Sequence, residues 1–328
     1  MKDAKQKFDV VAHNRSAWDR QVEGGNIWTL PVMPEQVARA RRGDWSVLLT
    51  ETKPVPASWF PLDVGGRFLP GVRVLCLASG GGQQGPILSA AGAIVTVFDN
   101  SPRQLERDRM VAERDGLRIT TVQGDMIDLS AFADESFDLV FHPVSNVFSA
   151  EVLPVYREAY RVLIRGGTLL AGFMNPDLYI LDMAEEEQGR MVVRFKLPYS
   201  DLESLSEEER LKLYGPDDPL EWSHTLQEQI GGIATVQLFR REAAAFARFD
   251  AIDRGHRDAN IESIRNLDEM VGKRFAFKLG KAGKEAGAYL EPKDADECMA
   301  GKKCLNLAVL VTQLLADLED LITPRQPG

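Results

Sequence analysis

The segment that most constrains the fold is residues 72–100, which read VRVLCLASGGGQQGPILSAAGAIVTVFDN. Residues 72–77 are a short apolar run with β-branched side chains, as in a strand that is buried on both faces. Residues 79–82 then form a Ser-Gly-Gly-Gly turn, residues 83–91 fit a helix, and residues 94–98 fit a second strand. This order of strand, turn, helix and strand predicts the ligand-binding unit of an α/β sheet.

The glycine-rich turn predicts where a ligand lies. Gly80 and Gly82 allow close approach of a ligand to the backbone, and the N–H groups that begin the following helix favour an anionic or polar group. Asp99 stands at the end of the second strand, where an acid can accept hydrogen bonds from ribose hydroxyls. Because Gly80 to Gly85 also matches G-x-G-x-x-G, this unit alone indicates either a dinucleotide or a nucleoside with an amino-acid tail.

Strands and helices continue to alternate beyond this unit. The predicted helices cover residues 102–115 and 152–163, and the predicted strands cover residues 117–123, 137–142 and 168–173. Strands at this spacing predict an α/β fold with a Rossmann-like, mostly parallel sheet and helices on both faces. In such sheets ligands bind at the carboxyl ends of the strands, so the residues that follow each strand are candidate site residues.

The sequence divides into three expected regions. Residues 1–70 precede the sheet and are predicted to form an N-terminal helical cap or lid. Residues 71–233 hold the sheet and bind the ligand, with an insertion at 175–225 that covers the pocket. Residues 234–328 form a C-terminal extension whose overall fold the pattern does not assign.

The two flanking regions carry further candidates. Asn26 and Trp28 lie in a Gly- and Pro-containing loop and are candidate contacts to a substrate or an adenine ring. In the C-terminal region, RFAFKLG from Arg274 and GAYLEPK from Gly287 are predicted hairpin strands. Residues 305–322 predict an amphipathic helix that packs on the core or on a second subunit, which would make a homo-oligomer.

Composition excludes several classes of protein. The chain of 328 residues has a formal net charge of −10, which argues against a nucleic-acid-binding surface. No signal peptide is recognised at the amino terminus, and no apolar run approaches the roughly 18 residues of a membrane span. Only Cys76, Cys298 and Cys304 are present, without a C-x-x-C pair, so we expect no disulfide framework, no metal site and a cytoplasmic location.

Five ordered segments together resemble a known family: LASGGGQQG, VFDNSPRQL, VQGDMIDL, FDLVFHPVSN and YRVLIRGGTLLAGF. They look like the class I S-adenosylmethionine-dependent methyltransferases, in particular the small-molecule group related to quinone-biosynthesis C-methyltransferases. The resemblance covers about residues 8–232. It implies S-adenosyl-L-methionine as the cofactor and methyl transfer to a small-molecule acceptor by in-line displacement at the sulfonium methyl.

The resemblance also implies roles for individual residues. The cofactor-binding candidates are Ser79, Gly80, Gly82, Asp99, Asn100, Gln104, Asp125, Met126 and His142, with Asn26 and Trp28 from the cap. Gly80 and Gly82 would hold the methionine part, and Asp99 would hold the ribose. Asp125 would accept a hydrogen bond from the adenine amine. Ala78 stands where many members have an acid, so the chain lacks that carboxylate for the ammonium group of the cofactor.

His142 is the candidate catalytic residue. An imidazole with an unperturbed pKa near 6.5 suits proton transfer at neutral pH, and His142 ends a predicted strand. The alternative is a hydrogen-bonded strand-end histidine that contacts the cofactor. Two other functions remain compatible with the residues: a nicotinamide-dependent oxidoreductase and a non-catalytic protein that binds an adenosyl ligand.

Overall fold

One seven-stranded sheet, in the order β3-β2-β1-β4-β5-β6-β7, forms the centre of the computed structural model. The structure describes residues 8–50, 53–182, 185 and 189–230, together with the backbone of residues 274–280 and 286–291. The parallel strands are β1 (Arg73–Leu77), β2 (Ile94–Asp99), β3 (Ile119–Gln123), β4 (Phe137–His142) and β5 (Leu163–Met174). The antiparallel strands are β6 (Arg274–Gly280) and β7 (Ala286–Glu291). The predicted hairpin strands are therefore confirmed, whereas the predicted helix over residues 305–322 lies outside the described residues.

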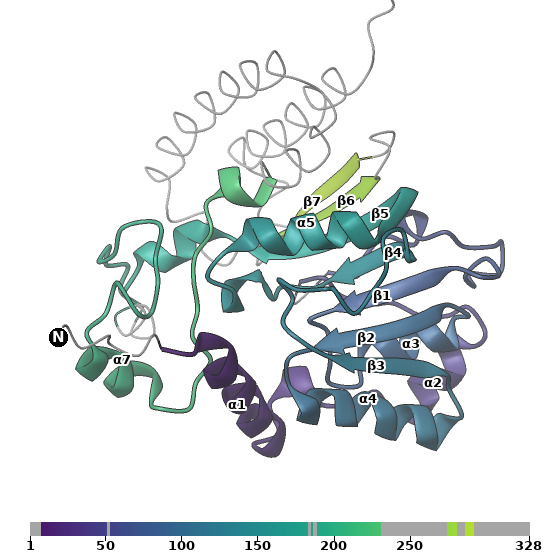
Figure 1. Cartoon of the computed structure of the whole chain (residues 1–328), viewed down its shortest axis with the longest axis horizontal. Coiled ribbons are helices and arrows are strands. Elements are labelled where there is room, and N and C mark those ends of the chain that lie inside the picture. Colours follow the sequence, from purple (N-terminus) through teal and green to yellow (C-terminus); the bar gives the residue numbers. More distant parts are fainter. Residues whose placement is uncertain are drawn as a thin grey trace, which may run out of the picture.

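Helices cover both faces of the sheet, as predicted (Figure 1). The helices are α1 (Val10–Glu23), η1 (Ile27–Thr29), α2 (Pro34–Ala40), η2 (Ala57–Trp59), α3 (Gln84–Ala90), α4 (Pro102–Asp115), η3 (Asn146–Phe148), α5 (Val152–Val162), η4 (Pro176–Ile180) and α7 (Glu207–Tyr214). Side chains of α2, α3 and α4 share one buried cluster, and those of α5 belong to a second one. The fold is thus a Rossmann-like α/β fold. No helix in the part of the chain that the structure describes is long and apolar enough to span a membrane.

The central position of β1 in the sheet explains why its residues 74–77 are all apolar. Val74 and Cys76 belong to the cluster with α3, whereas Leu75 and Leu77 belong to the cluster with α5. All four side chains are fully buried. A strand that is buried on both faces cannot alternate between apolar and polar residues, so the continuous run follows from its central position.

α4 begins and ends where the sequence predicts. The Ser101 hydroxyl accepts a hydrogen bond from the backbone N–H of Gln104 at the first turn, and Pro102 occupies the first helical position. Gly116 ends the helix with φ of 62°, in the left-handed region that glycine adopts without strain. The first turn of α4 is therefore fixed beside the end of β2.

β5 begins earlier than the sequence predicts. Leu163 already pairs with Phe137 of β4, whereas regular pairing resumes only at Thr168 opposite Leu139. The residues between them form an irregular stretch, in which Gly166 has φ of 79°. Arg165, Gly166 and Gly167, which precede the predicted strand, make a bulge inside β5 instead.

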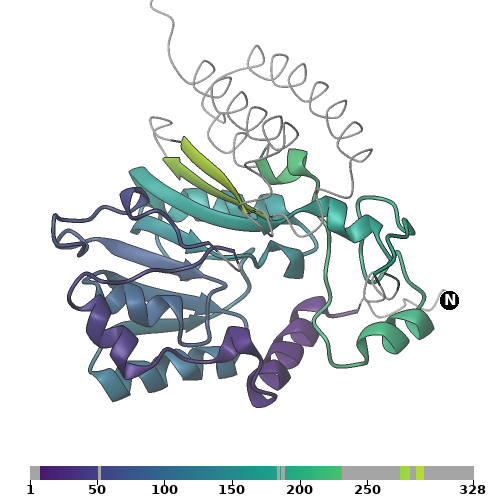
Figure 2. The ribbon, with the colours of Figure 1, turned by 180° about the vertical axis from the view of Figure 1, so that it is seen from behind.

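α1 and the segment that follows α7 lie side by side beyond one end of the sheet (Figures 1 and 2). The Asn14 side chain donates to the carbonyl of Leu220 at 3.1 Å and accepts from the Leu220 N–H at 2.8 Å. His13 Nε2 is hydrogen-bonded to the carbonyl of Asp218 at 2.9 Å. These contacts join the N-terminal segment to the segment after β5, so the two form one cover.

Candidate functional site

A cavity of about 1330 Å³ lies at the carboxyl ends of the parallel strands, under this cover. The predicted candidates other than Gly82 and His142 line it: Asn26, Trp28, Ser79, Gly80, Asp99, Asn100, Gln104, Asp125 and Met126. Ligand sites typically occupy roughly 300–1,000 Å³, so this cavity has room for more than one small molecule. The fold therefore brings most of the predicted residues to one place.

The turn after β1 packs closely against β2 and α4. The Gly80 N–H donates to Asp99 Oδ2 at 2.9 Å, and the Gly81 N–H donates to the carbonyl of Gln104 at 3.1 Å. A Cβ atom at Gly80 would lie 2.6 Å from Gln104 Cβ, which is too close for any side chain. Gly82 faces away from the cavity, and its N–H donates to Asp108 Oδ2 at 3.2 Å.

Ala78 has left-handed backbone geometry, with φ of 47°. For a residue with a Cβ this conformation costs about 1–2 kcal/mol. Its N–H donates to the carbonyl of Phe98 at 2.8 Å, and its own carbonyl accepts from the Ser145 hydroxyl at 2.8 Å. The strained residue is thus held from both sides where the chain leaves β1 and enters the cavity wall.

Asp99 is positioned by backbone N–H groups. Its Oδ2 accepts from Gly80 and its Oδ1 accepts from Ser101, both at 2.9 Å. Burial raises the pKa of Asp99 to about 6, although the backbone hydrogen bonds lower it. At neutral pH the carboxylate is mostly ionised, which suits it to accept hydrogen bonds from hydroxyl groups of a ligand.

Asn100 and Gln104 have different surroundings. Asn100 links the end of β2 to α1, because its side chain donates to the carbonyl of Val11 at 2.9 Å and accepts from Arg15 Nε at 3.0 Å. Gln104 is only 6% exposed, and its Oε1 has no hydrogen-bond partner among the described residues. A buried amide oxygen without a partner is a candidate acceptor for a ligand N–H or O–H.

Asp125 and Met126 follow β3 at the same edge. Burial raises the pKa of Asp125, and its Oδ1 accepts from the Ile127 N–H at 3.3 Å. Met126 packs against the core cluster on the α5 side of the sheet. A carboxylate beside a thioether suits an aromatic ligand that bears an amine.

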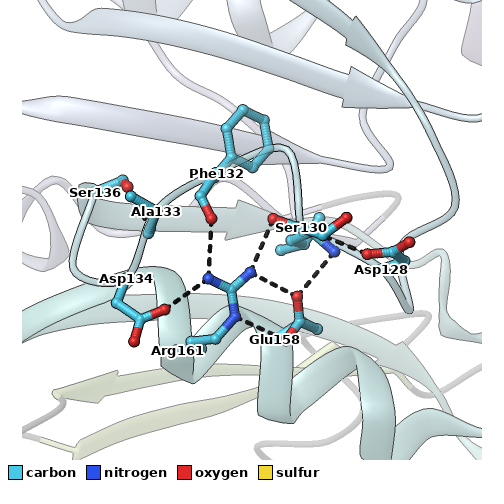
Figure 3. Close-up of polar contacts among 9 residues, drawn as sticks. Asp128, Ser130, Phe132, Ala133, Asp134, Ser136, Glu158 and Arg161 are labelled. Atoms are coloured by element: carbon cyan, nitrogen blue, oxygen red, sulfur yellow. Dashed lines mark hydrogen bonds and ion pairs between the residues drawn. The ribbon is translucent and has the colours of Figure 1, made fainter.

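Arg161 holds the loop that continues from Asp125, as Figure 3 shows. Its guanidinium donates to the carbonyls of Leu129 and Phe132 at 2.8 and 2.9 Å and forms ion pairs with Asp134 and Glu158. The two nitrogens Nε and Nη2 both bind the Glu158 carboxylate, which in turn accepts from the Leu129 N–H. One side chain of α5 thereby fixes the loop after β3.

Asn26 and Trp28 belong to the N-terminal cap and help to hold its helix η1 in place. Asn26 Oδ1 accepts from the Trp28 N–H at 2.9 Å and so caps η1. Gln83 Nε2 donates to the carbonyls of Ile27 and Leu30, at 2.9 and 3.0 Å, which ties η1 to the glycine turn. The Trp28 side chain is 38% exposed and lines the cavity.

The expectation that His142 is a general base needs correction. His142 is 1% exposed and does not line the cavity. Its Nδ1 donates to the carbonyl of Leu77 at 2.9 Å, and its Nε2 is hydrogen-bonded to Asn146 Oδ1 at 2.6 Å. Burial lowers the pKa of His142. Since both ring nitrogens have partners inside the protein, the imidazole cannot reach an acceptor and instead positions the loop after β4.

Two groups of site residues are missing from the predictions. Asp108 is fully buried under the glycine turn, and burial raises its pKa to about 8. Asp108 lies on the buried face of α4, four residues after Gln104 and three before Val111. This helical spacing is the sequence pattern that could have identified it as a buried residue. Tyr179, on the short helix η4, and Glu221, in an irregular segment after α7, also line the cavity, but neither segment carries a periodic sequence pattern. The described residues contain no cluster of potential metal ligands.

Comparison with known proteins identifies the family. A family model described as a methyltransferase domain matches residues 75–171. The Bacillus subtilis (strain 168) protein named Uncharacterized methyltransferase YbaJ is 52% identical over 223 residues, which cover 68% of this chain and 85% of that protein. The Aspergillus fumigatus sterol 24-C-methyltransferase erg6 is 31% identical over 141 residues, but the match covers 42% of this chain and only 37% of that protein.

The chain is also similar to solved structures of methyltransferases. The S-adenosylmethionine-dependent methyltransferase from Mesorhizobium loti is 18% identical, with a TM-score of 0.40 over 51% of this chain and 74% of that chain. The relative from Bacillus subtilis is 52% identical and is matched over 85% of its length. The chain therefore belongs to the class I S-adenosylmethionine-dependent methyltransferases, whose cofactor is S-adenosyl-L-methionine.

Proposed function

We propose that the protein transfers the methyl group of S-adenosylmethionine to a small-molecule acceptor enclosed in the cavity at the carboxyl edge of the sheet. The observation that carries this proposal is the lining of the cavity. Asp99 and Asp125 line it at the ends of β2 and β3, and Tyr179 and Glu221 line it from the segments after β5 and after α7. Its volume of about 1330 Å³ leaves space for an acceptor beside the cofactor.

The residues near the ends of β1, β2 and β3 fit the cofactor. Gly80 lets the turn after β1 pack directly against Gln104 and Asp99, which keeps the backbone of the turn beside these two residues of the cavity lining. Asp99 would accept hydrogen bonds from the ribose hydroxyls, and the unpartnered Gln104 Oε1 would accept one from a donor of the ligand. Asp125 would bind the adenine amine, with Met126 against the ring.

The protein contributes mainly orientation and exclusion of water. The bound cofactor supplies a methyl group that a positively charged sulfur already activates. Holding an acceptor in line with that methyl can lower the barrier by about 7–11 kcal/mol. Here α1 and residues 217–221 would close the cavity from above, because the side chain of Asn14 holds them together.

Ligand binding and turnover test this proposal. S-adenosylhomocysteine should raise the melting temperature of the protein, whereas NAD should not, since the nicotinamide-dependent alternative requires the opposite result. Cofactor labelled in the methyl group should then label a small molecule in a panel of amines, phenols, quinols and thiols. Binding of S-adenosylhomocysteine with no turnover on any acceptor would favour the non-catalytic adenosyl-binding alternative. Stabilisation by NAD alone would overturn the proposal.

A further inference from the structure

Tyr179 and Glu221 form a hydrogen-bonded pair in the lining of the cavity. The Tyr179 hydroxyl donates to Glu221 Oε2 at 2.6 Å, and both residues line the cavity. Tyr179 lies on η4, directly after β5, and Glu221 lies in the segment that pairs with α1. None of the cofactor contacts described above uses this pair.

The surrounding residues hold the pair in place. Asp201 Oδ2 accepts from the Glu221 N–H at 2.7 Å, and Asp201 Oδ1 accepts from the Tyr199 hydroxyl at 2.7 Å. The rings of Tyr179 and Tyr199 stack with their centroids 5.3 Å apart. Glu221 Oε1 accepts no hydrogen bond from a residue that the structure describes. One carboxylate oxygen is thus oriented by Tyr179, while the other remains for a ligand.

The charge of the wall indicates what kind of ligand it favours. Besides Asp99 and Asp125, the acidic lining residues are Asp9, Asp44, Glu151, Asp201, Asp218 and Glu221. Arg39 is the one basic side chain among the described lining residues, and it pairs with Asp44 at 2.8 Å. Tyr179 and Tyr214 line the same cavity. A wall of carboxylates and aromatic rings attracts a cation and repels an anion.

An unpartnered hydroxyl in the same cavity provides independent support for a bound molecule. Thr50 is 4% exposed, and its Oγ1 has no hydrogen-bond partner among the described residues. The preceding carbonyl, of Leu49, accepts from the Val144 N–H at 3.0 Å, which places Thr50 near the end of β4. Burying a hydroxyl without a partner costs about 1–3 kcal/mol, so this atom is suited to a hydrogen bond with a ligand.

We propose that Glu221, Tyr179 and Asp201 form the acceptor subsite, and that its ligand is a small primary amine that enters as an ammonium ion. This inference rests on the proposed methyl transfer. Glu221 Oε1 would bind the ammonium, and the aromatic rings would pack against it. Amines are favoured over carboxylate-bearing acceptors because the wall offers no unpaired cation among the described lining residues.

Glu221 would also remove a proton before the transfer. An ammonium nitrogen has no lone pair, so one N–H bond must break, with its proton moving to Glu221 and its electron pair staying on nitrogen. That pair then forms the bond to the methyl carbon, while the electrons of the broken C–S bond remain on sulfur. Burial raises the pKa of Glu221 to about 7, with Asp201 and Asp218 adding to the effect and Tyr179 opposing it. The carboxyl group can therefore hold and release a proton near neutral pH.

Calorimetry on the full chain saturated with S-adenosylhomocysteine tests the subsite without turnover. The probes are phenethylamine, cyclohexylmethylamine and butylamine, each with the alcohol and the carboxylate of matching size. At least one amine should bind more tightly than its alcohol, and no carboxylate should bind. Glu221→Gln should weaken amine binding about 10-fold to 100-fold, and Tyr179→Phe should weaken it less. Glu208→Gln, an exposed position on α7 outside the cavity, is the control.

The outcomes separate this inference from the proposed function. Unchanged amine affinity in Glu221→Gln, equal affinity for the alcohols or carboxylates, or no binding of any amine would overturn the amine subsite. In each of these cases S-adenosylhomocysteine would still bind the wild-type protein. Failure of the wild-type protein to bind S-adenosylhomocysteine would instead overturn the proposed methyl transfer. Glu221→Gln should retain wild-type affinity for S-adenosylhomocysteine, which shows that the variant is folded.

Discussion

The backbone N–H of Gly80 donates a hydrogen bond of 2.9 Å to the carboxylate of Asp99. This bond joins the turn after β1 to the end of β2. The second oxygen of Asp99 accepts from the Ser101 N–H, so the carboxylate is fixed before a ligand arrives. A group that is already oriented loses little conformational freedom on binding, which favours affinity.

Asp99→Asn should weaken binding of S-adenosylhomocysteine about 10-fold or more, because it removes a charged acceptor that the ribose hydroxyls would use. In the wild-type protein the affinity should also fall as the pH drops through about 6, where Asp99 gains a proton. Calorimetry over that range measures both effects. Glu113→Gln, an exposed change on α4, is the control. An Asp99→Asn protein with wild-type affinity would remove Asp99 from the site.

Gly80→Ala should abolish cofactor binding with a moderate loss of stability. Its Cβ would lie 2.6 Å from Gln104 Cβ and 3.0 Å from Asp99 Oδ2, so the turn or the carboxylate must move. Overpacking of this kind costs about 1–3 kcal/mol. Gly116→Ala is the matched control, because its φ of 62° strains alanine while no atom lies within 4 Å of the new Cβ. Gly116→Ala should lose stability and keep its affinity; equal affinity in both variants would contradict the predicted role of Gly80.

Local patterns explain how much of the fold could be predicted. The apolar run of β1, the glycine turn and the Ser101 and Gly116 ends of α4 each depend on residues that are near in sequence. The edge at which the strands end follows from their parallel order, so Asp99 and Asp125 could be placed together. The bulge at Gly166 could not be predicted from the sequence, because it depends on how β5 pairs with β4.

The positions of Tyr179 and Glu221 in the cavity lining depend on contacts between segments that are distant in sequence. Tyr179 and Glu221 are 42 residues apart and lie in segments without a helical or strand period. His142 was predicted to face the ligand because it ends a strand. Its ring instead points to the carbonyl of Leu77, which only the register of β4 against β1 determines. The residue type alone does not predict the direction in which such a side chain points.

Asp108→Asn should change how stability depends on pH. Burial raises the pKa of Asp108 in the folded protein to about 8, from an ordinary value of 3.8. The unfolded chain therefore releases this proton at lower pH than the folded protein does. The contribution of Asp108 to the free energy of unfolding is therefore complete below about pH 4, near its ordinary pKa. It is lost as the pH rises through about 8, its pKa in the folded protein.

Because asparagine does not titrate, the Asp108→Asn variant should gain stability over the wild-type protein as the pH rises across this window. The gain should reach up to about 1.4 kcal/mol per pH unit. Urea unfolding of both proteins at several pH values measures the difference. Glu113→Gln should follow the wild-type curve. A constant difference between wild type and Asp108→Asn would show that Asp108 is ionised in the folded protein.

Arg161→Lys should destabilise the protein by about 2–3 kcal/mol, although it keeps the charge. A lysine ammonium cannot reach the carbonyls of Leu129 and Phe132 and the Glu158 carboxylate together (Figure 3). Arg165→Lys is the control, because Arg165 is 73% exposed and should change stability by less than about 0.5 kcal/mol. Urea unfolding measures both variants, and equal effects would show that the Arg161 contacts contribute little.

His142→Ala separates a positioning role from a catalytic one. The substitution leaves the carbonyl of Leu77 and the Asn146 side chain without their partner in a buried place, which should cost about 2–4 kcal/mol of stability. Because Asn146 is also hydrogen-bonded to Tyr156 and Gln229, the loop after β4 should shift. Affinity for S-adenosylhomocysteine and turnover should then fall together, and the pH profile of turnover should keep its shape. A general base would give the opposite result: turnover would fall at unchanged stability and affinity, and the rise of the profile near the pKa of the imidazole would disappear.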